Sequence, residues 1–396
     1  MRANGASHRD VTPGALPLPD EAARAHSDRV VTHIRDAIGA AGGFLPFSRY
    51  MELALYAPGL GYYVAGTRKF GPAGDFVTAP ELSPLYGAAL TRQLAPILQA
   101  TRRDIVELGA GSGALAASVL GALANLDCAP AAYRILEVSP ALREDQRATI
   151  AARVAHVQQC VRWIDRLPAV INGVVLMNEV LDAVPPAVIA RRGDAWFERG
   201  VAWRDGALAW DERPLIDAKL LAIARERFPP EGDYVSEVNP AAEALVATLG
   251  RRLASGALLI VDYGFPASEY YHPQRNEGTL VGHYRHRVHA DPFLWPGLSD
   301  LTAHVDFTAI ASAGARAGLQ VKAFATQASF LLGCGILDLL RDAGPPDSLD
   351  YLRAASEVQK LLAPSEMGEL FKVLLLARGE VEWRSLALID MARRLG

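Results

Sequence analysis

The stretch that decides the fold is Asp104-Ile-Val-Glu-Leu-Gly-Ala-Gly-Ser-Gly-Ala-Leu115. A short apolar run carries an acid, Glu107, and leads into three alternate glycines, after which residues 114–123 are rich in Ala, Leu and Val. The pattern predicts a strand, a tight turn and a helix, because glycine tolerates positive φ and lets the backbone approach a ligand closely. The free N–H groups at the start of such a helix can hold a polar ligand.

Two classes of cofactor fit this turn. Gly109-x-Gly111-x-x-Ala114 satisfies the relaxed dinucleotide fingerprint. With Glu107 in front, the same residues are similar to the loop that binds S-adenosylmethionine in class I methyltransferases. The acid suits the cationic amino group of a methionine moiety and would repel a pyrophosphate, and Gly113 comes one residue early for the dinucleotide pattern. An ordinary turn without a ligand is the third interpretation, and three alternate glycines after an acid make it uncommon.

The composition is that of a globular protein with a large core. Of the 396 residues, 51% are apolar and 21% are charged. The net charge of −4 does not indicate a protein that binds nucleic acid. The three cysteines are scattered without metal-ligand spacing, so we interpret them as buried thiols in a reducing compartment. No apolar run is long enough to span a membrane, and residues 1–19 lack the apolar core of a secretory signal. We therefore expect a cytoplasmic protein of bacterial type, or a protein of the mitochondrial matrix if the chain is eukaryotic.

The chain divides into four segments. We expect a disordered tail at residues 1–20, helices and loops at 21–84, a main domain at 85–380 and a C-terminal segment at 381–396. In the main domain strands alternate with helices, which indicates an α/β fold with a parallel sheet. Three insertions interrupt it: short antiparallel strands at about 187–235, a long irregular segment at about 265–303, and a mostly helical stretch at about 328–366.

Acidic side chains follow several of the predicted sheet strands. Glu107, Glu137, Glu179, Asp182 and Asp262 fall at or just past the carboxyl ends of these strands. That edge is where open α/β sheets bind ligands, so these acids are candidates for binding as well as for helix capping. Glu137 lies about 24 residues after the last glycine of the turn, close to where Rossmann-like folds place a ribose-binding acid.

Polar residues are also concentrated in two loops. The loop at residues 70–83 carries Asp75 and Glu81 between aromatic residues, which is more than a connector needs. The segment at 265–303 holds several histidines without the tight ligand spacing of a zinc site, so we expect no metal and interpret this segment as a substrate-facing lid. Just beyond it, His304 is a candidate base and Asp306 is either a helix N-cap or a site residue.

Together these pieces resemble the MidA family of class I methyltransferases, whose mitochondrial member is an assembly factor for respiratory complex I. The resemblance covers roughly residues 40–380, and its most specific pieces are residues 74–83 and 300–307. Other matching pieces are Glu137-Val-Ser-Pro140, Asn178-Glu-Val-Leu-Asp182 and Val261-Asp-Tyr-Gly264. The resemblance implies a Rossmann-like, mostly parallel sheet of seven strands with an N-terminal helical segment and helical and β insertions. It also implies that S-adenosylmethionine is the cofactor and that a protein arginine, in a subunit of the NADH dehydrogenase complex, is methylated.

The candidate site residues then form three groups. Those expected to bind the cofactor are Glu107, Gly109, Gly111, Gly113, Glu137 and Asn178. Those expected to take part in catalysis are Glu179, Asp182, Asp75 and His304. Those expected to contact the substrate are Glu81, Asp262, Tyr263 and Asp306. Paired carboxylates can hold a guanidinium and orient one of its nitrogens for in-line transfer.

Three other functions stay open at this point: a methyltransferase for a small molecule, a non-catalytic assembly chaperone that binds the cofactor, and a dinucleotide oxidoreductase. A wide acidic groove favours a protein substrate, whereas a closed apolar pocket favours a small molecule. Stabilisation by NAD alone would indicate the oxidoreductase. The identity of the acceptor stays open, as does the oligomeric state, a homodimer included.

Overall fold

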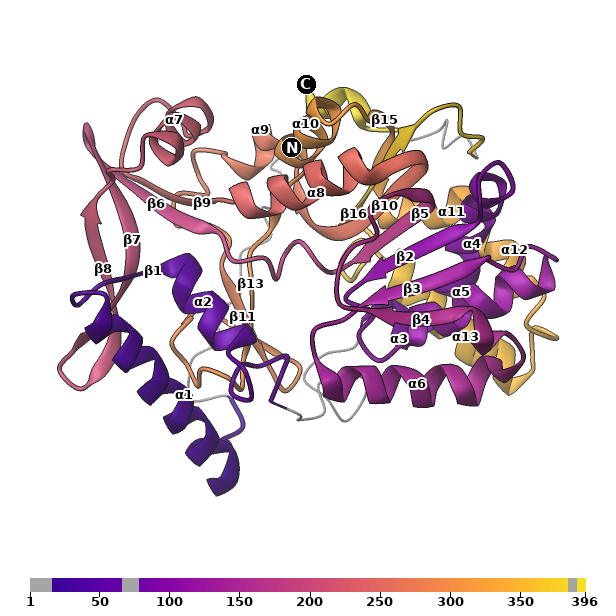
Figure 1. The fold of residues 1–396 in the computed structure, drawn as a ribbon, viewed down its shortest axis with the longest axis horizontal. Helices are drawn as coiled ribbons and strands as arrows, with labels where there is room; N and C mark the ends of the chain where they lie inside the picture. The colour runs from indigo at the N-terminus through magenta and orange to yellow at the C-terminus, as the bar shows by residue number, and fades with distance from the viewer. Residues whose placement is uncertain (1–15, 66–77, 384–389) are drawn as a thin grey trace.

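The computed structural model describes residues 16–65, 78–383 and 390–396. Most of the expected N-terminal tail and most of the loop at 70–83 therefore lie outside the described residues. Figure 1 shows two lobes: a body of parallel strands and helices on the right, and a smaller lobe of antiparallel strands and N-terminal helices on the left.

A mostly parallel sheet forms the centre of the larger body. Its strands lie in the order β15 (Gln320–Thr326), β16 (Phe371–Arg378), β10 (Leu253–Phe265), β5 (Ile171–Asn178), β2 (Asp104–Leu108), β3 (Ala132–Leu136) and β4 (Val161–Ile164). β16 runs antiparallel to both of its neighbours, and the short β14 (Val305–Asp306) pairs with the end of β10. This arrangement confirms the expected Rossmann-like fold class.

Both faces of this sheet are covered, because alternate residues of the central strands are apolar on opposite sides. In β5, Val174 and Leu176 pack with α4 (Pro84–Gln99) and α5 (Ala114–Asn125). The neighbouring residues Val175 and Met177 pack instead with α8 (Pro240–Arg252) and α10 (Phe307–Arg316). The first layer also contains α6 (Pro140–Val154), α11 (Gln327–Gly333), α12 (Ile336–Arg341) and α13 (Leu349–Leu362).

The smaller lobe joins two segments that are far apart in the sequence. β6 (Ala187–Arg192), β7 (Ala195–Arg204), β8 (Ala207–Pro214) and β9 (Tyr234–Val238) are antiparallel, as predicted, and β1 (Leu45–Pro46) adds to the edge of β7. α1 (Glu21–Ala40) and α2 (Phe47–Tyr56) pack on this sheet through a core that includes Ile34, Tyr50 and Val188. α7 (Ala218–Arg227) leads from β8 towards β9. The N-terminal helices thus belong to the same unit as the β insertion.

The segment at residues 265–303 is not irregular, and in this respect the prediction was wrong. It contains α9 (Ala267–Tyr270) and a three-stranded antiparallel sheet of β11 (Val281–Tyr284), β12 (Arg287–His289) and β13 (Asp300–Thr302). Strands of three or four residues are too short for an alternating pattern to be recognised in a sequence.

Three short helices complete the fold: α3 (Ala79–Leu82) and the 3₁₀ helices η2 (Ala155–Cys160) and η3 (Ala392–Leu395). Within the described part of the chain, we find no helix with both the length and the apolar character of a membrane span.

Candidate active site

The glycine turn has the predicted geometry. β2 ends at Leu108, and α5 begins at Ala114. Between them Gly109, Gly111 and Gly113 all adopt left-handed backbone conformations, with φ of +61°, +54° and +86°. Residues with a Cβ rarely adopt these values, so the turn depends on glycine at all three positions.

A cavity of about 290 Å³ lies beside this turn, at the carboxyl ends of β2, β3 and β5. The larger body contributes residues 107–112, 136–138, 178–180 and 182–183 to its wall, whereas Gly113, at the end of the turn, does not line the cavity. The smaller lobe and the inserted sheet contribute Tyr56, Tyr63 and Asp300. The cavity therefore occupies the edge at which open α/β sheets bind ligands, and elements from outside that sheet add to its wall.

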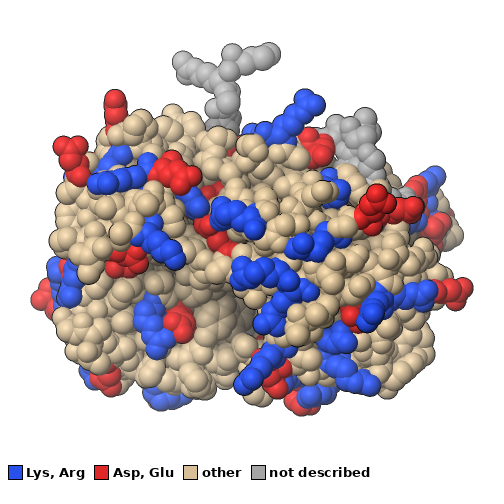
Figure 2. All heavy atoms as spheres, turned by 45° about the horizontal axis from the view of Figure 1, so that its top comes forward, with Lys and Arg blue, Asp and Glu red and all other residues tan. Residues whose placement is uncertain are grey.

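Carboxylates dominate the polar lining of this cavity. The acids in the lining are Glu81, Glu107, Glu137, Glu179, Asp182 and Asp300. Of the described residues that line it, none is Lys, Arg or His. Figure 2 shows a different arrangement on one outer face, where Lys and Arg side chains gather beside a hollow in the middle of the molecule. The concentration of acids is therefore a property of the interior of the site.

Burial raises the pKa values of four of them: Glu107, Glu137, Glu179 and Asp182. Desolvation raises the pKa of Glu107 to about 7 and that of Asp182 to about 7. Desolvation together with the neighbouring charge of Asp182 raises the pKa of Glu179 to about 8. Carboxylates in such an environment retain protons near neutral pH unless a cation compensates their charge. The cavity is therefore suited to cationic ligands.

Glu107 and Glu137 occupy the predicted positions in the cavity wall. The Tyr133 hydroxyl donates to Glu107 Oε2 at 2.8 Å. Glu137 accepts the backbone N–H of Ser139 at 2.8 Å and the side-chain amide of Gln146 at 3.0 Å. Both carboxylates are thus held in one orientation by buried partners.

Gln146, on α6, connects the two predicted cofactor-binding elements. Its Nε2 donates to the carbonyl of Gly111 at 3.0 Å as well as to Glu137. Its Oε1 accepts from the Trp163 indole at 2.8 Å. The sequence analysis missed Gln146, because a glutamine within a charged helix carries no local signal of such contacts.

The turn after β5 presents Glu179 and Asp182 to the cavity. Glu179 has φ of +53°, which is uncommon for a residue with a side chain and indicates local strain. The buried carboxylate of Asp262 supports this turn: its Oδ2 accepts backbone N–H groups of Val180 at 3.2 Å, Leu181 at 2.8 Å and Asp182 at 3.4 Å. Asp262 does not belong to the cavity lining. We had expected it to contact substrate, and the structure shows that it supports the turn instead.

Asn178 and Glu81 connect neighbouring parts of the wall. The Tyr86 hydroxyl donates to Asn178 Oδ1 at 2.7 Å, and Asn178 Nδ2 donates to Glu179 Oε1 at 3.0 Å. Asn178 therefore lies between the glycine side and the acid turn. Glu81, which we expected to contact substrate, accepts a short hydrogen bond from Ser112 in the glycine turn, so it lies on the same side as that turn.

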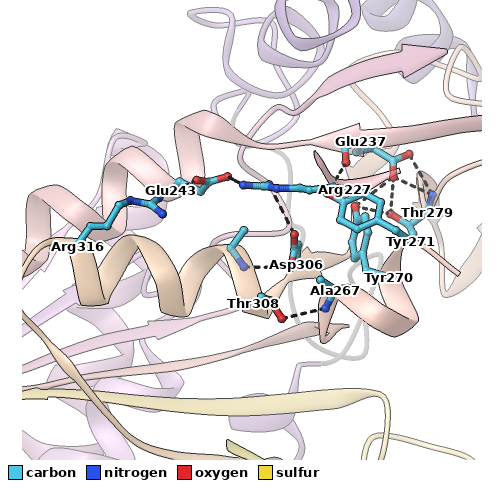
Figure 3. A network of polar contacts seen from close by, with 11 residues as sticks. Arg227, Glu237, Glu243, Ala267, Tyr270, Tyr271, Thr279, Asp306, Thr308 and Arg316 are labelled. Atoms are coloured by element: carbon cyan, nitrogen blue, oxygen red, sulfur yellow. Dashed lines mark hydrogen bonds and ion pairs between the residues drawn. The ribbon is translucent and has the colours of Figure 1, made fainter. Parts of the chain in front are cut away.

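Asp306 lies away from the cavity, in the network that Figure 3 shows. It caps α10 by accepting the Ala309 N–H at 3.1 Å, and its other oxygen is 3.6 Å from Arg227, which also pairs with Glu243 at 2.9 Å. Of the two roles considered for Asp306, the helix N-cap is the one that the structure shows. Its expected contact with substrate has no support in this geometry.

His304 and Tyr263 also lie outside the cavity lining. The His304 ring packs edge-on against Phe265, with centroids 5.2 Å apart, and its backbone N–H donates to Thr279. The Tyr263 ring packs on Phe371 at 4.0 Å. A role for His304 as base or for Tyr263 as substrate contact therefore has no support in this geometry. Asp75 lies outside the described residues.

Tyr56, Tyr63 and Asp300 line the cavity although they were not among the predicted site residues. The Tyr63 hydroxyl lies 3.0 Å from both carboxylate oxygens of Asp300. The Tyr56 ring stacks on Tyr63 with centroids 5.5 Å apart, and its hydroxyl donates to the Ala183 carbonyl at 2.9 Å. The aromatic pair Tyr62-Tyr63 and the specific piece at residues 300–307 were the only local signals for this wall.

Comparison with known proteins identifies the family. The family model Methyltransf_28, described as an S-adenosyl-L-methionine-dependent methyltransferase, matches residues 89–325, which is more than half of the chain. The chain belongs to this methyltransferase family. Two similar crystal structures from Burkholderia thailandensis agree with it. One is bound to S-adenosyl-homocysteine, with 47% identity and a TM-score of 0.92, and covers 96% of this chain and 100% of that chain. The other is a native structure with 46% identity, a TM-score of 0.89 and the same coverage.

Curated relatives of the methyltransferase include eukaryotic proteins. The "Protein arginine methyltransferase NDUFAF7, mitochondrial" of Mus musculus is 29% identical over 370 residues, which cover 83% of this chain and 80% of that protein. The Homo sapiens protein of the same name is 28% identical, with 84% and 80% covered. The cofactor of the methyltransferase is S-adenosyl-L-methionine. The cavity fits this cofactor, because the glycine turn allows a ligand to approach the backbone closely and the buried carboxylates can bind cationic groups.

Proposed function

We propose that this methyltransferase transfers a methyl group to an arginine side chain of a protein. The observation that carries the proposal is the set of three carboxylates, Glu179, Asp182 and Asp300, in one cavity that has no Lys, Arg or His among its described lining residues. A guanidinium is protonated at any physiological pH, and carboxylates bind it with paired hydrogen bonds. The relatives that are named protein arginine methyltransferases support the same acceptor.

The cofactor half of the site is formed by Glu107, the glycine turn, Glu137 and Asn178. Glu107 would bind the cationic amino end of the cofactor, and Glu137, which lies where a Rossmann-like fold binds ribose, would bind its ribose. Bound S-adenosylmethionine supplies a methyl group on a positively charged sulfur. Buried acids in a partly desolvated site attract this cation strongly, because their charge is poorly compensated in its absence.

The acceptor half is formed by Glu179 and Asp182. These carboxylates hold the guanidinium and direct one of its nitrogens towards the methyl group, so that positioning supplies much of the catalysis. The acceptor nitrogen exchanges a proton for the methyl group. A bound guanidinium would keep Glu179 ionised, and its buried carboxylate, whose pKa is raised from the ordinary value, is then a stronger base than an exposed one and would take this proton.

The protein acceptor is, in our proposal, a subunit of the respiratory NADH dehydrogenase, and methylation takes place in the cytoplasm. The resemblance of residues 74–83 and 300–307 to the family with a complex I assembly factor supports this acceptor.

The test is methyl transfer from labelled S-adenosylmethionine to NADH dehydrogenase subunits, with mass spectrometry to locate the methylated residue. We expect methylation on arginine by the wild type, and a rate reduced at least about 100-fold in Glu179→Gln at unchanged cofactor affinity. Glu52→Gln, on the exposed side of α2, is the matched control and should retain full activity. Full transfer by Glu179→Gln, or methylation of small molecules only, would contradict the proposal.

A further inference from the structure

Gln146 is a buried side chain behind the cofactor half of the site. It is 0% exposed, and neither Gln146 nor Trp163 of β4 belongs to the cavity lining. The amide of Gln146 nevertheless contacts two parts of the cavity wall, which are the carbonyl of Gly111 and the carboxylate of Glu137. These two groups follow the neighbouring parallel strands β2 and β3, so one side chain connects the ends of both strands.

The hydrogen-bond partners of Gln146 select one orientation of its amide group. The Trp163 indole N–H can only donate, and it donates to Oε1 at 2.8 Å. The Gly111 carbonyl and the ionised Glu137 carboxylate can only accept, and each lies 3.0 Å from Nε2, which has two protons to donate. A flipped amide would turn its oxygen towards two acceptors and its nitrogen towards the indole N–H. Trp163 therefore fixes the amide of Gln146, and this amide fixes the Glu137 carboxylate.

Tight packing on both sides supports this orientation. Gly113 lies directly against α6, because a Cβ added at Gly113 would meet the Cα of Gln146 at 3.0 Å. On the other side, the Trp163 ring lies beside Arg147, whose Cζ is 4.6 Å from the ring centroid. Side chains packed in this way lose alternative rotamers, so the chain of hydrogen bonds from Trp163 to Glu137 is held as one unit.

The hydrogen bond from Gln146 also favours the ionised form of Glu137. Burial raises the pKa of this carboxyl group, and hydrogen bonds from the Ser139 N–H and from the Gln146 amide oppose the rise. An ionised carboxylate is an acceptor on both oxygens, whereas the hydroxyl groups of a ribose can donate. An ionised and oriented Glu137 is therefore the form that suits a ribose.

We propose that Gln146 and Trp163 are positioning residues for cofactor binding, which together hold the Glu137 carboxylate in the orientation that accepts the ribose hydroxyl groups of S-adenosylmethionine. This inference rests on the cofactor half of the proposed function, in which Glu137 binds the ribose. Both residues act from behind the cavity wall: Trp163 acts through Gln146, and Gln146 acts through Glu137.

The experiment measures the affinity of the full-length protein for S-adenosylhomocysteine and for its 2′-deoxy analogue by calorimetric titration. The ratio of the two affinities reports recognition of the ribose. The variants are Gln146→Leu, Trp163→Phe and, as the direct comparison, Glu137→Gln. The matched controls are Gln158→Leu, exposed in η2, and Trp203→Phe, on β7, whose ring also lies beside an arginine. Melting temperatures report whether each variant is folded.

We expect the wild type to bind S-adenosylhomocysteine at least about tenfold more tightly than the 2′-deoxy analogue, because an analogue that lacks a hydroxyl group leaves a buried acceptor unpaired. Gln146→Leu should weaken binding of S-adenosylhomocysteine about tenfold and bring the ratio close to that of Glu137→Gln. Trp163→Phe should have a smaller effect of the same kind. Adding it to Gln146→Leu should have little further effect, because Trp163 acts through Gln146. Both controls should keep the wild-type ratio.

The outcomes separate the inference from the proposed function. If Glu137→Gln lowers the ratio while Gln146→Leu and Trp163→Phe retain it, the inference is wrong and the role of Glu137 stands. If Gln146→Leu weakens both ligands by the same factor, Gln146 has only a general structural role and the inference is wrong. If Glu137→Gln itself retains the ratio, the ribose role of Glu137 and the inference are both wrong, whereas arginine methylation is tested separately by the transfer assay. Trp163→Phe leaves Gln146 in place, so it decides between these outcomes even if Gln146→Leu does not fold.

Discussion

At the scale of single residues, several acids that line the cavity have raised pKa values because they are buried. Glu107 shows this most clearly: it is 2% exposed, it accepts one hydrogen bond from Tyr133, and its pKa rises to about 7. Its folded-state pKa lies above its usual value, so the folded protein binds this proton more tightly than the unfolded chain. Stability of the unliganded protein that depends on this group is therefore present at low pH and is lost as pH rises towards about 7.

Cofactor affinity should have the opposite dependence on pH. Ionised Glu107 is the form that attracts the amino group, so affinity for S-adenosylmethionine should fall as pH drops below about 7, by up to about tenfold per pH unit. Isothermal titration calorimetry across this range measures the effect. Glu107→Gln should lower the affinity and flatten the profile. An unchanged slope in this variant would assign the titration to another group.

At the scale of elements, the site depends on how β10 supports the turn after β5. These strands are parallel neighbours, and Asp262, at the end of β10, accepts three backbone N–H groups of that turn. The turn holds Glu179 in a strained conformation, which such over-determined bonding can maintain. Asp262 is thus a positioning residue that acts through Glu179 and Asp182.

Asp262→Asn should therefore change kcat more than cofactor affinity. The substitution removes charge-assisted hydrogen bonds, each of which contributes about 1.5–3 kcal/mol, and we expect kcat to fall at least about tenfold. Steady-state kinetics with separate cofactor titration checks this. Asp217→Asn is the matched control, because Asp217 also accepts backbone N–H groups, at the exposed start of α7. Equal losses of kcat and cofactor affinity in Asp262→Asn would indicate general unfolding of the site.

At the scale of the whole molecule, a largely buried network of ion pairs connects the smaller lobe to the larger body. Arg227, at the end of α7, pairs with Glu243 of α8 at 2.9 Å and lies 3.6 Å from Asp306 at the start of α10 (Figure 3). The side chains of these three residues are between 9% and 16% exposed, so the network is largely shielded from solvent. The relative position of the lobes, and with it the cavity wall, depends on such contacts.

Removing Arg227 should destabilise the protein without directly altering the site. Arg227→Met leaves Glu243 and Asp306 without their shared cation, which we expect to cost about 2–4 kcal/mol in the free energy of unfolding. Urea unfolding measures this change. The Arg316 side chain, which is the other partner of Glu243, is 65% exposed. Arg316→Met should therefore lower the free energy of unfolding by less than about 1 kcal/mol. Equal costs for the two substitutions would show that the Arg227 network is no more stabilising than a surface ion pair.

The sequence by itself determined the fold class and the glycine turn with the acids beside it. Alternate glycines at positive φ and acids at strand ends are local signals, because each depends on a few consecutive residues and on the direction of one strand. This is why Glu107, Glu137 and Glu179 were predicted and found in one cavity.

Only the tertiary structure decided the part of the cavity wall that Tyr63 and Asp300 form. Tyr63 and Asp300 meet because α2 and β13 pack beside the acid turn, and no local pattern encodes a contact between residues 237 positions apart. His304 and Asp306 do not line the cavity, although their sequence context suggested a role in the site. Asp262 supports the acid turn and does not line the cavity, because its carboxylate accepts the N–H group of Leu181, 81 positions away, and only the packing of the strands decides such a contact.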